Sequence, residues 1–229
     1  MNTATKVGGR KCCGGGAYFC GMPNIPITSL SQLDPNGTYS YADYLTWQFT
    51  ELVELLRGKI MRRMSAPTDL HQDAVVELSF LLRTHLRRQR CRVRVAPYDV
   101  RLVKRGTSDQ PADAAIRTVV QPDVCVICDP AKREARGCLG APDFIIEVTS
   151  PSTQARDWKD KFDLYEENGV TEYWIIDPLG HSISAFVLDA ATARYRLAGE
   201  YTRPGPVPCA TLPELALDWA DVFPDAEGE

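Results

Sequence analysis

Residues 141–153 read APDFIIEVTSPST, and the glutamate in the middle of this stretch needs an explanation. The core FIIEV, residues 144–148, is an apolar run bounded by prolines, which is typical of a buried β-strand. Glu147 stands inside that run, and a buried ionised carboxylate costs several kcal/mol unless a partner compensates it. We therefore expect a buried strand whose glutamate meets a specific partner.

A second apolar strand, DVCVIC, opens with Asp123 directly after a proline. If the two strands are neighbours in a sheet, Asp123 and Glu147 lie side by side and raise each other's pKa. A divalent cation would remove that repulsion, and Mg²⁺ prefers such oxygen ligands. Two other interpretations stay open: Asp123 ends a turn, and Glu147 forms a structural salt bridge with an arginine.

A lysine follows on the next predicted helix, where Asp157 and Lys161 are four residues apart and share one face. Taken alone, the pair is a weak exposed ion pair. Beside a carboxylate-bound metal, Lys161 would orient or deprotonate a water and stabilise charge on phosphorus, which suits phosphodiester hydrolysis. Asp143 competes with Asp123, but it shares a strand with Glu147, so we rank it lower.

The rest of the chain indicates one domain of mixed α and β structure, an α+β (α/β) fold with helices around a central sheet, over residues 37–229. Residues 1–36 are rich in Gly and Pro and predict a flexible Cys/Gly-rich extension. The periodicities predict the following elements: short helices at 39–47 and around 219–223, two strands within 49–64 broken near Arg57-Gly58, a helix at about 69–89, a strand at 91–103 interrupted at Pro97, a helix at 157–168 ended by Asn168-Gly169, a strand at 171–177 and a hairpin over 181–201.

The formal net charge of −4 argues against a generally basic surface, but a local basic region exists. It contains Arg83, Arg87, Arg88, Arg90, Arg92, Arg94, Arg101, Lys104 and Arg105 against the single acid Asp99. On charge alone this is a solvated surface; near an acidic metal site it would face phosphates.

The eight cysteines predict reduced thiols and no disulfide framework. Cys125 and Cys128 have the spacing of half a zinc site, but they lie in the run VCVIC and no second pair follows, so we expect small buried side chains. Cys12, Cys13 and Cys20 belong to the predicted extension. No apolar run reaches the length of a membrane span, and the first 27 residues lack the apolar centre of a secretory signal, so we expect a cytoplasmic protein.

The stretches QPDVCVICDP and APDFIIEVTSPSTQARDWKDKFDLYEENGVTEYWIIDP resemble the Uma-two family of the PD-(D/E)XK, or restriction-endonuclease-like, nuclease superfamily. ELLRGKIMRRMSAPTDLHQ resembles an upstream region of that family, so the resemblance spans about residues 39–222. It implies a restriction-endonuclease-like fold with a mixed central β-sheet, and metal-dependent cleavage of nucleic acid, foremost DNA, with Mg or Mn as cofactor.

The resemblance further implies Asp123 and Glu147 as the motif acids. Thr149 occupies the usual lysine position, so the motif lysine is displaced to Lys161. Glu54 matches an additional acidic position and is a further candidate metal ligand, although Lys59 stands where the family often has an acid. His71 and Gln72 would line the cleft together with Asp157; a histidine at a helix start also serves in packing or capping.

Arg87, Arg88 and Arg92 are the candidate nucleic-acid contacts, and a homodimer would suit cleavage of both strands. The alternative function is a non-catalytic nucleic-acid- or protein-binding module that retains the nuclease fold. A third interpretation is a structural protein in which Glu147 and Lys161 form only a salt bridge.

Overall fold

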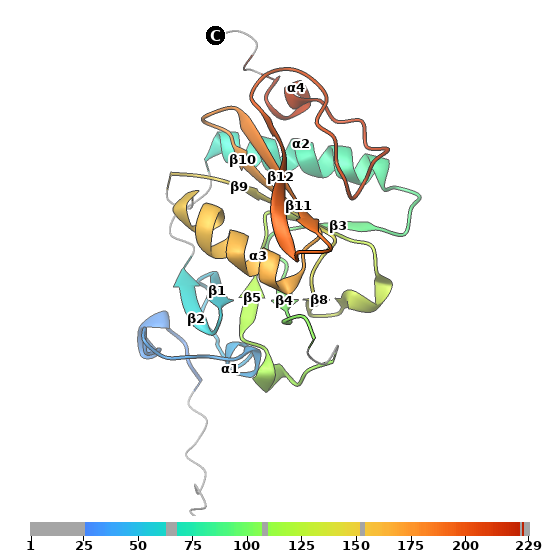
Figure 1. Ribbon diagram of the computed structural model, residues 1–229. Helices are drawn as coiled ribbons and strands as arrows, with labels where there is room; N and C mark the ends of the chain where they lie inside the picture. The colour runs from blue at the N-terminus through green and yellow to red at the C-terminus, as the bar shows by residue number, and fades with distance from the viewer. Residues whose placement is uncertain (1–25, 63–67, 107–109, 152–153, 225, 227–229) are drawn as a thin grey trace, which may run out of the picture.

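The strands form two mixed six-stranded sheets in the computed structural model, which describes residues 26–62, 68–106, 110–151, 154–224 and 226 (Figure 1). The first sheet has the order β2-β1-β5-β4-β8-β7 and consists of β1 (Val53–Leu56), β2 (Lys59–Arg62), β4 (Val100–Leu102), β5 (Thr118–Val120), β7 (Arg133–Glu134) and β8 (Gly137–Leu139). The second has the order β12-β11-β10-β9-β6-β3 and consists of β3 (Arg92–Val95), β6 (Val124–Ile127), β9 (Phe144–Val148), β10 (Glu172–Asp177), β11 (Ser182–Asp189) and β12 (Arg194–Tyr201).

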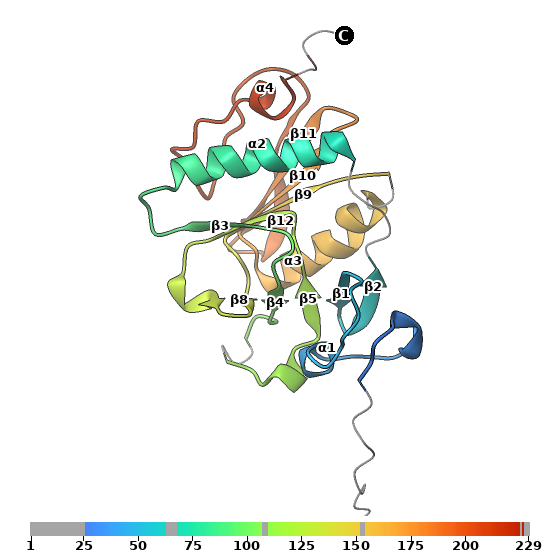
Figure 2. The same cartoon turned by 180° about the vertical axis from the view of Figure 1, so that it is seen from behind.

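Helices cover both faces of the second sheet. The helical elements are α1 (Tyr41–Tyr44), α2 (Asp69–His85), α3 (Phe162–Asn168), α4 (Trp219–Val222), the π-helix η4 (Arg156–Lys161) and 3-10 turns at Leu30–Gln32, Asp113–Ala115 and Pro130–Lys132. Helix α2 lies behind the sheet in Figure 1 and in front of it in Figure 2, whereas α3 lies on the opposite side. The expected α+β class with flanking helices is therefore confirmed, with its strands divided between two sheets.

The two faces of this sheet explain the apolar run of β9. Phe144 and Ile146 pack with Leu78 of α2, while Ile145 packs with Tyr165 of α3. A strand buried on both faces needs apolar residues at successive positions rather than in alternation. Every residue of β9 is buried, as the sequence predicts.

The predicted strand at 91–103 and the stretch around Pro122 are each divided between the two sheets. The segment 91–103 breaks at Ala96-Pro97, with β3 in the second sheet and β4 in the first. The segment around Pro122 likewise leaves the first sheet as β5 and enters the second as β6. Proline lacks the N–H that a continuing ladder requires, so both breaks follow from its chemistry.

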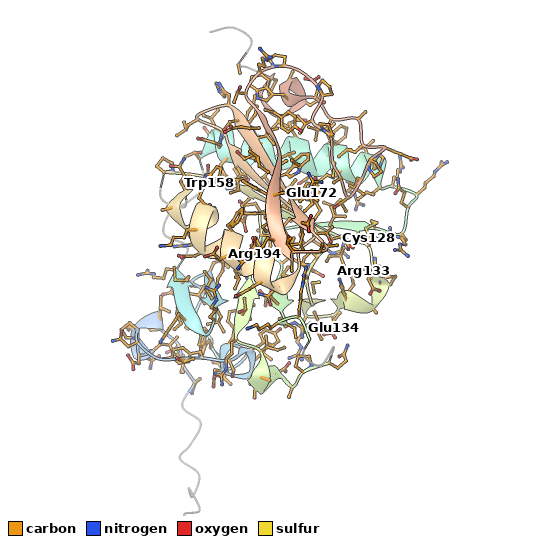
Figure 3. All side chains as sticks on the ribbon, viewed as in Figure 1. Cys128, Arg133, Glu134, Trp158, Glu172 and Arg194 are labelled. Atoms are coloured by element: carbon orange, nitrogen blue, oxygen red, sulfur yellow. A yellow bond between two sulfur atoms is a disulfide. The ribbon has the colours of Figure 1, made fainter. Side chains whose placement is uncertain are left out.

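The turns that the sequence predicts at glycines are present. Arg57 and Gly58 form the β1–β2 turn with φ of 51° and 84°. Gly169 ends α3 with φ of 88°. Helix α2 ends at His85, four residues before the predicted end. The predicted helix at 157–168 begins as η4, from which Trp158 extends to an edge contact with Phe186 of β11 (Figure 3).

One cysteine prediction is wrong: Cys91 and Cys128 form a disulfide. The antiparallel register pairs Arg92 with Ile127, so the next position on each strand brings the two cysteines opposite one another. Such a pairing between segments distant in the sequence cannot be read from residue spacing. Cys125, Cys138 and Cys209 are free and buried, as expected of small apolar side chains. Cys12, Cys13 and Cys20 lie outside the described residues.

Candidate active site

Glu147 has two buried donors on one oxygen. Its Oε1 accepts a hydrogen bond from Tyr165 Oη at 2.6 Å and from Lys161 Nζ at 2.8 Å. The glutamate side chain is only 2 % exposed. A charged donor and a phenol together compensate the carboxylate that the apolar strand carries. The arginine partner considered from the sequence is therefore a lysine.

Lys161 is the centre on which several acids converge. Its Nζ lies 3.4 Å from Glu54 Oε1 and 3.9 Å from Asp157 Oδ1, in addition to the contact with Glu147. Lys161 and Asp157 are both buried, so the interpretation as an exposed ion pair is wrong. The π-helix η4 carries both residues, and single π-helical turns occur often at functional sites.

Asp123 directly precedes β6, which pairs with β9, the strand of Glu147. The antiparallel register pairs Val124 of β6 with Ile146 of β9, so Asp123 comes opposite Glu147. Asp123 Oδ2 accepts the backbone N–H of Val148 at 2.9 Å. The competing Asp143 is at the other end of this strand pair, where its Oδ2 accepts the Cys128 N–H at 2.7 Å. Asp123 therefore lies opposite Glu147, whereas Asp143 does not.

His71 reaches the cluster from the first turn of α2. Its Nε2 lies 3.3 Å from Asp123 Oδ2, and the ring is mostly buried. Thr68, rather than His71, caps the helix by accepting the His71 N–H. Gln72 is exposed on the same helix, and no described hydrogen bond joins its side chain to the cluster. The structure thus brings His71, and not Gln72, to these acids.

Whereas Glu147 belongs to the second sheet, Glu54 belongs to the first. It is buried on β1, and its Oε1 accepts the backbone N–H of Gln121 at 2.7 Å. The Gln121 side chain in turn donates to Asp99 Oδ1 at 2.9 Å. Gln121 precedes Pro122 and Asp123, so the link that carries the chain between the sheets also orients Glu54.

Sequence reasoning missed Tyr165, the second donor to Glu147. Its only signal was its position four residues after Lys161, which places the two side chains on one helical face. Tyr173 of β10 was missed as well; its hydroxyl donates to the Asp157 backbone carbonyl at 3.1 Å. Tyrosine in an apolar helix–sheet interface normally indicates packing, so neither contact could be anticipated from pattern.

The electrostatics of the cluster are dominated by burial and an excess of acid. Burial raises the pKa of Glu147 to about 8; Lys161 opposes this rise, whereas Asp123, Asp157 and Glu54 add to it. For Lys161, burial acts to lower the pKa, but Glu147, Glu54, Asp157 and Asp123 outweigh it and the pKa is raised. The lysine is therefore held as ammonium, and Glu147 binds its proton more tightly than an exposed glutamate does.

The donor set suits a hard divalent cation in charge and ligand type, because four buried acids surround one ammonium. No group of three or more His, Cys, Asp or Glu side chains in the described part of the chain is already arranged to hold a metal. Lys161 instead occupies the point where Glu54 and Glu147 converge.

The predicted basic region is dispersed. Arg87, Arg88 and Arg92 are exposed beyond the end of α2 opposite to His71. The 17-residue helix separates these two ends by roughly 25 Å. Arg101 is buried against Glu134 and stacks over Tyr41, so it belongs to the interior rather than to a phosphate-facing surface.

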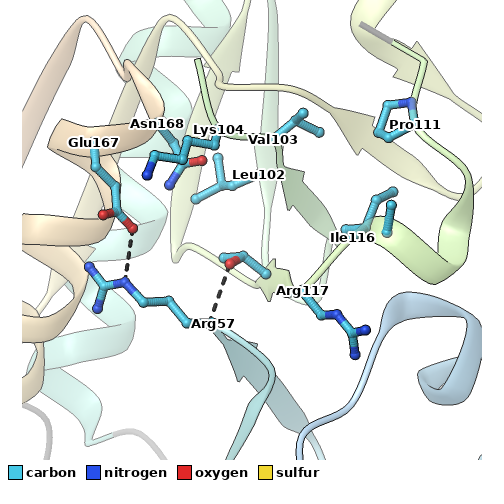
Figure 4. A pocket seen from close by; sticks show the side chains of 11 residues that line it. Arg57, Leu102, Val103, Lys104, Pro111, Ile116, Arg117, Glu167 and Asn168 are labelled. Carbon is cyan, nitrogen blue, oxygen red and sulfur yellow. Dashed lines mark hydrogen bonds and ion pairs between the residues drawn. The ribbon is translucent and has the colours of Figure 1, made fainter. Parts of the chain in front are cut away.

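A cavity of about 410 Å³ lies at the C-terminal end of α3 (Figure 4). Its lining includes the cations Arg57, Lys104 and Arg117, and the Arg57 Nε–Glu167 Oε1 ion pair of 2.9 Å crosses one side. None of the acids that surround Lys161 lines it. The cavity and the carboxylate cluster are therefore separate features of the molecule.

None of the described helices is both long and apolar enough to cross a membrane. A protein of Synechocystis sp. described as uncharacterised is 29% identical over 156 residues, which cover 67% of this chain and 71% of the relative. A crystal structure from Anabaena variabilis, described as "a putative nuclease belonging to DUF820", matches with a TM-score of 0.63 and 20% identity, covering 81% of this chain and 98% of that one. At that identity the likeness shows the fold.

The family model Uma2, described as "Putative restriction endonuclease", matches residues 41–220. This range contains Glu54, Asp123, Glu147 and Lys161. The chain therefore belongs to the Uma2 family.

Proposed function

We propose that this protein is a divalent-metal-dependent endonuclease that hydrolyses phosphodiester bonds in DNA. The observation that carries the proposal is the convergence of Glu54, Glu147 and Asp157 on the buried ammonium of Lys161. These residues come from two sheets and a helix, and family membership supports a nuclease-like role. The cytoplasmic location stays a prediction.

Asp123, Glu147 and Glu54 would hold the metal, which is Mg²⁺ or Mn²⁺ in this proposal. When bound, such an ion supplies positive charge to the phosphate and lowers the pKa of a coordinated water. Tyr165 holds Glu147 Oε1 in place through its short hydrogen bond. His71 Nε2 faces Asp123 Oδ2 at 3.3 Å from the first turn of α2.

Lys161 acts as a cation in this proposal. Because its pKa is raised, Nζ donates hydrogen bonds to phosphoryl oxygens and stabilises the charge that develops on them. Deprotonation of the attacking water by Lys161 would require a neutral amine, which the surrounding acids disfavour. Asp157, four residues earlier, positions the ammonium.

Cleavage assays with Mg²⁺ or Mn²⁺ on DNA and RNA substrates test the proposal. Glu147→Gln and Lys161→Gln should abolish cleavage, while Lys159→Ala, an exposed lysine of the same turn, should leave it intact. Circular dichroism reports whether each variant is folded. If the Lys161→Gln protein does not fold, the Glu147→Gln variant alone tests the proposal, because its amide oxygen can still accept the hydrogen bond from Tyr165. Undiminished cleavage by folded Glu147→Gln protein would refute the assignment.

The second candidate is a binding module without catalysis. The 2.8 Å contact between Lys161 and Glu147 favours it, because the pair satisfies its own charges without a metal. DNA binding without cleavage under any divalent cation would support this function instead. A purely structural role for the pair predicts that calorimetry detects no divalent-metal binding.

A further inference from the structure

Helix α2 carries an exposed stripe that the core does not use. The stripe consists of Asp69, Asp73, Val76, Phe80, Arg83 and Arg87, the last of which lies in the turn after the helix. All six are exposed, with Val76 58% and Phe80 63% accessible. Steps of four and three residues alternate along it, which is the spacing of a helix–helix contact. The opposite face packs on the second sheet through Ala74, Val75, Leu78 and Leu82.

The order of charges along this α2 stripe is directional: two acids, two apolar residues, then two arginines. Across the described ranges, none of the four charged side chains forms an ion pair with another residue. The acidic end and the basic end of the stripe therefore face solvent, where a partner with the reverse order of charges could pair with both.

We propose that the α2 stripe binds the same stripe of a second copy, with the two helices antiparallel about a two-fold axis that passes midway between Val76 and Phe80. In this arrangement Asp69 faces Arg87, Asp73 faces Arg83, and Val76 faces Phe80 of the partner subunit. Each contact then occurs twice, as a two-fold interface requires. The apolar residues occupy the centre and the ion pairs the two ends, the usual order of an interface core and rim.

Charge selects this partner over others. A parallel pair of α2 helices would place Asp beside Asp and Arg beside Arg. A uniformly acidic or basic surface would be repelled by one end of the stripe. Only a partner with the reversed order satisfies both ends, and the antiparallel second copy supplies it.

The dimer also changes where the arginines lie relative to the candidate active site, an inference that rests on the proposed function. Within one chain, Arg88 and His71 are near opposite ends of α2. Antiparallel pairing brings Arg88 of the partner subunit beside Thr68, close to the end that holds His71. Phosphate contacts to each site would then come from the other copy, while Arg87 serves the interface.

Light scattering coupled to size exclusion tests the interface by mass, without any assay of cleavage. The wild-type chain should show twice its 25.5 kDa mass. Phe80→Glu should halve the measured mass, because it places a charge at the apolar centre. Leu45→Glu is the matched control, since Leu45 is 43% exposed at the end of α1, which lies at the opposite end of the molecule from α2 (Figure 1).

Charge reversal tests the antiparallel order itself. Asp69→Lys/Asp73→Lys and Arg83→Glu/Arg87→Glu should each be monomeric alone, because like charges then face one another. Mixed in equal amounts, the two variants should form a heterodimer, because every facing pair is again opposite in sign. A monomeric wild type, a dimeric Phe80→Glu variant, or a mixture that stays monomeric would each overturn the proposal. Loss of cleavage in a protein that still dimerises would bear on the proposed function alone.

Discussion

Lys161 Nζ lies 2.8 Å from Glu147 Oε1, and the two side chains are 4% and 2% exposed. The pair joins η4 to the centre of the second sheet. Because the same ammonium also faces Glu54 and Asp157, its removal would leave an acidic cluster with no cation.

Lys161→Met should lower the free energy of unfolding by roughly 3–5 kcal/mol at neutral pH, because it leaves the buried acids without the positive charge that they face. Urea titration measures the loss. Adding Glu147→Gln should recover part of it, since the double variant buries one acid fewer. Equal losses in the single and double variants would contradict the coupling.

The stability of the metal-free protein should fall as pH rises from about 5 to about 8. Folding raises the pKa of Glu147 from 4.5 to about 8, so the folded state binds this proton more tightly than the unfolded chain. The stability that the Glu147 proton contributes is therefore fully present below the ordinary pKa of a glutamate and is lost as the pH rises through 8. In that range the free energy of unfolding should fall by up to about 1.4 kcal/mol per pH unit.

Glu147→Gln should flatten this pH dependence, because its side chain does not titrate. Urea unfolding of the two proteins across the same pH series makes the comparison. Parallel slopes in the variant and the wild type would show that another group is responsible.

Glu54→Gln should preserve the fold and weaken metal binding. The amide oxygen still accepts the Gln121 N–H, but the negative charge is lost. Under the proposed function, the Mg²⁺ concentration for half-maximal cleavage should rise by at least roughly tenfold. Glu51→Gln, an exposed change at the start of the same region, should leave it unchanged.

Reduction of the Cys91–Cys128 disulfide should destabilise the protein by roughly 2–4 kcal/mol, because the closed loop of 37 residues restricts the unfolded chain. Urea unfolding with and without dithiothreitol measures this difference. The Cys91→Ala/Cys128→Ala variant should be insensitive to the reductant. A reductant effect that persists in that variant would point to other cysteines.

Glu172→Ala should lower the free energy of unfolding by roughly 3 kcal/mol or more, because it leaves the buried Trp174 indole and two backbone N–H groups without their acceptor. The fully buried carboxylate accepts the Trp174 Nε1–H at 2.8 Å and the backbone N–H groups of Ala210 and Thr211 at 3.0 and 2.6 Å (Figure 3). Thermal unfolding tests the loss, with exposed Glu200→Ala as the control.

Local features could be predicted from sequence because they depend on neighbouring residues. The apolar run of β9 requires burial on both faces, and Gly169 permits the left-handed turn that ends α3. The positions of Asp123 and Glu147 followed from one further step, the pairing of two adjacent strands.

Other features depended on tertiary packing. Glu54 meets Lys161 only because the chain crosses between the sheets at Pro122, and Cys91 meets Cys128 only through the register of β3 and β6. The separation of the arginines from His71 depends on the length and orientation of α2. The sequence by itself determined which strand carries a buried acid and where its helices stop, because short-range backbone preferences and periodic burial set these. Tertiary structure decided which cation compensates that acid, because contacts across many residues form only when all layers pack together.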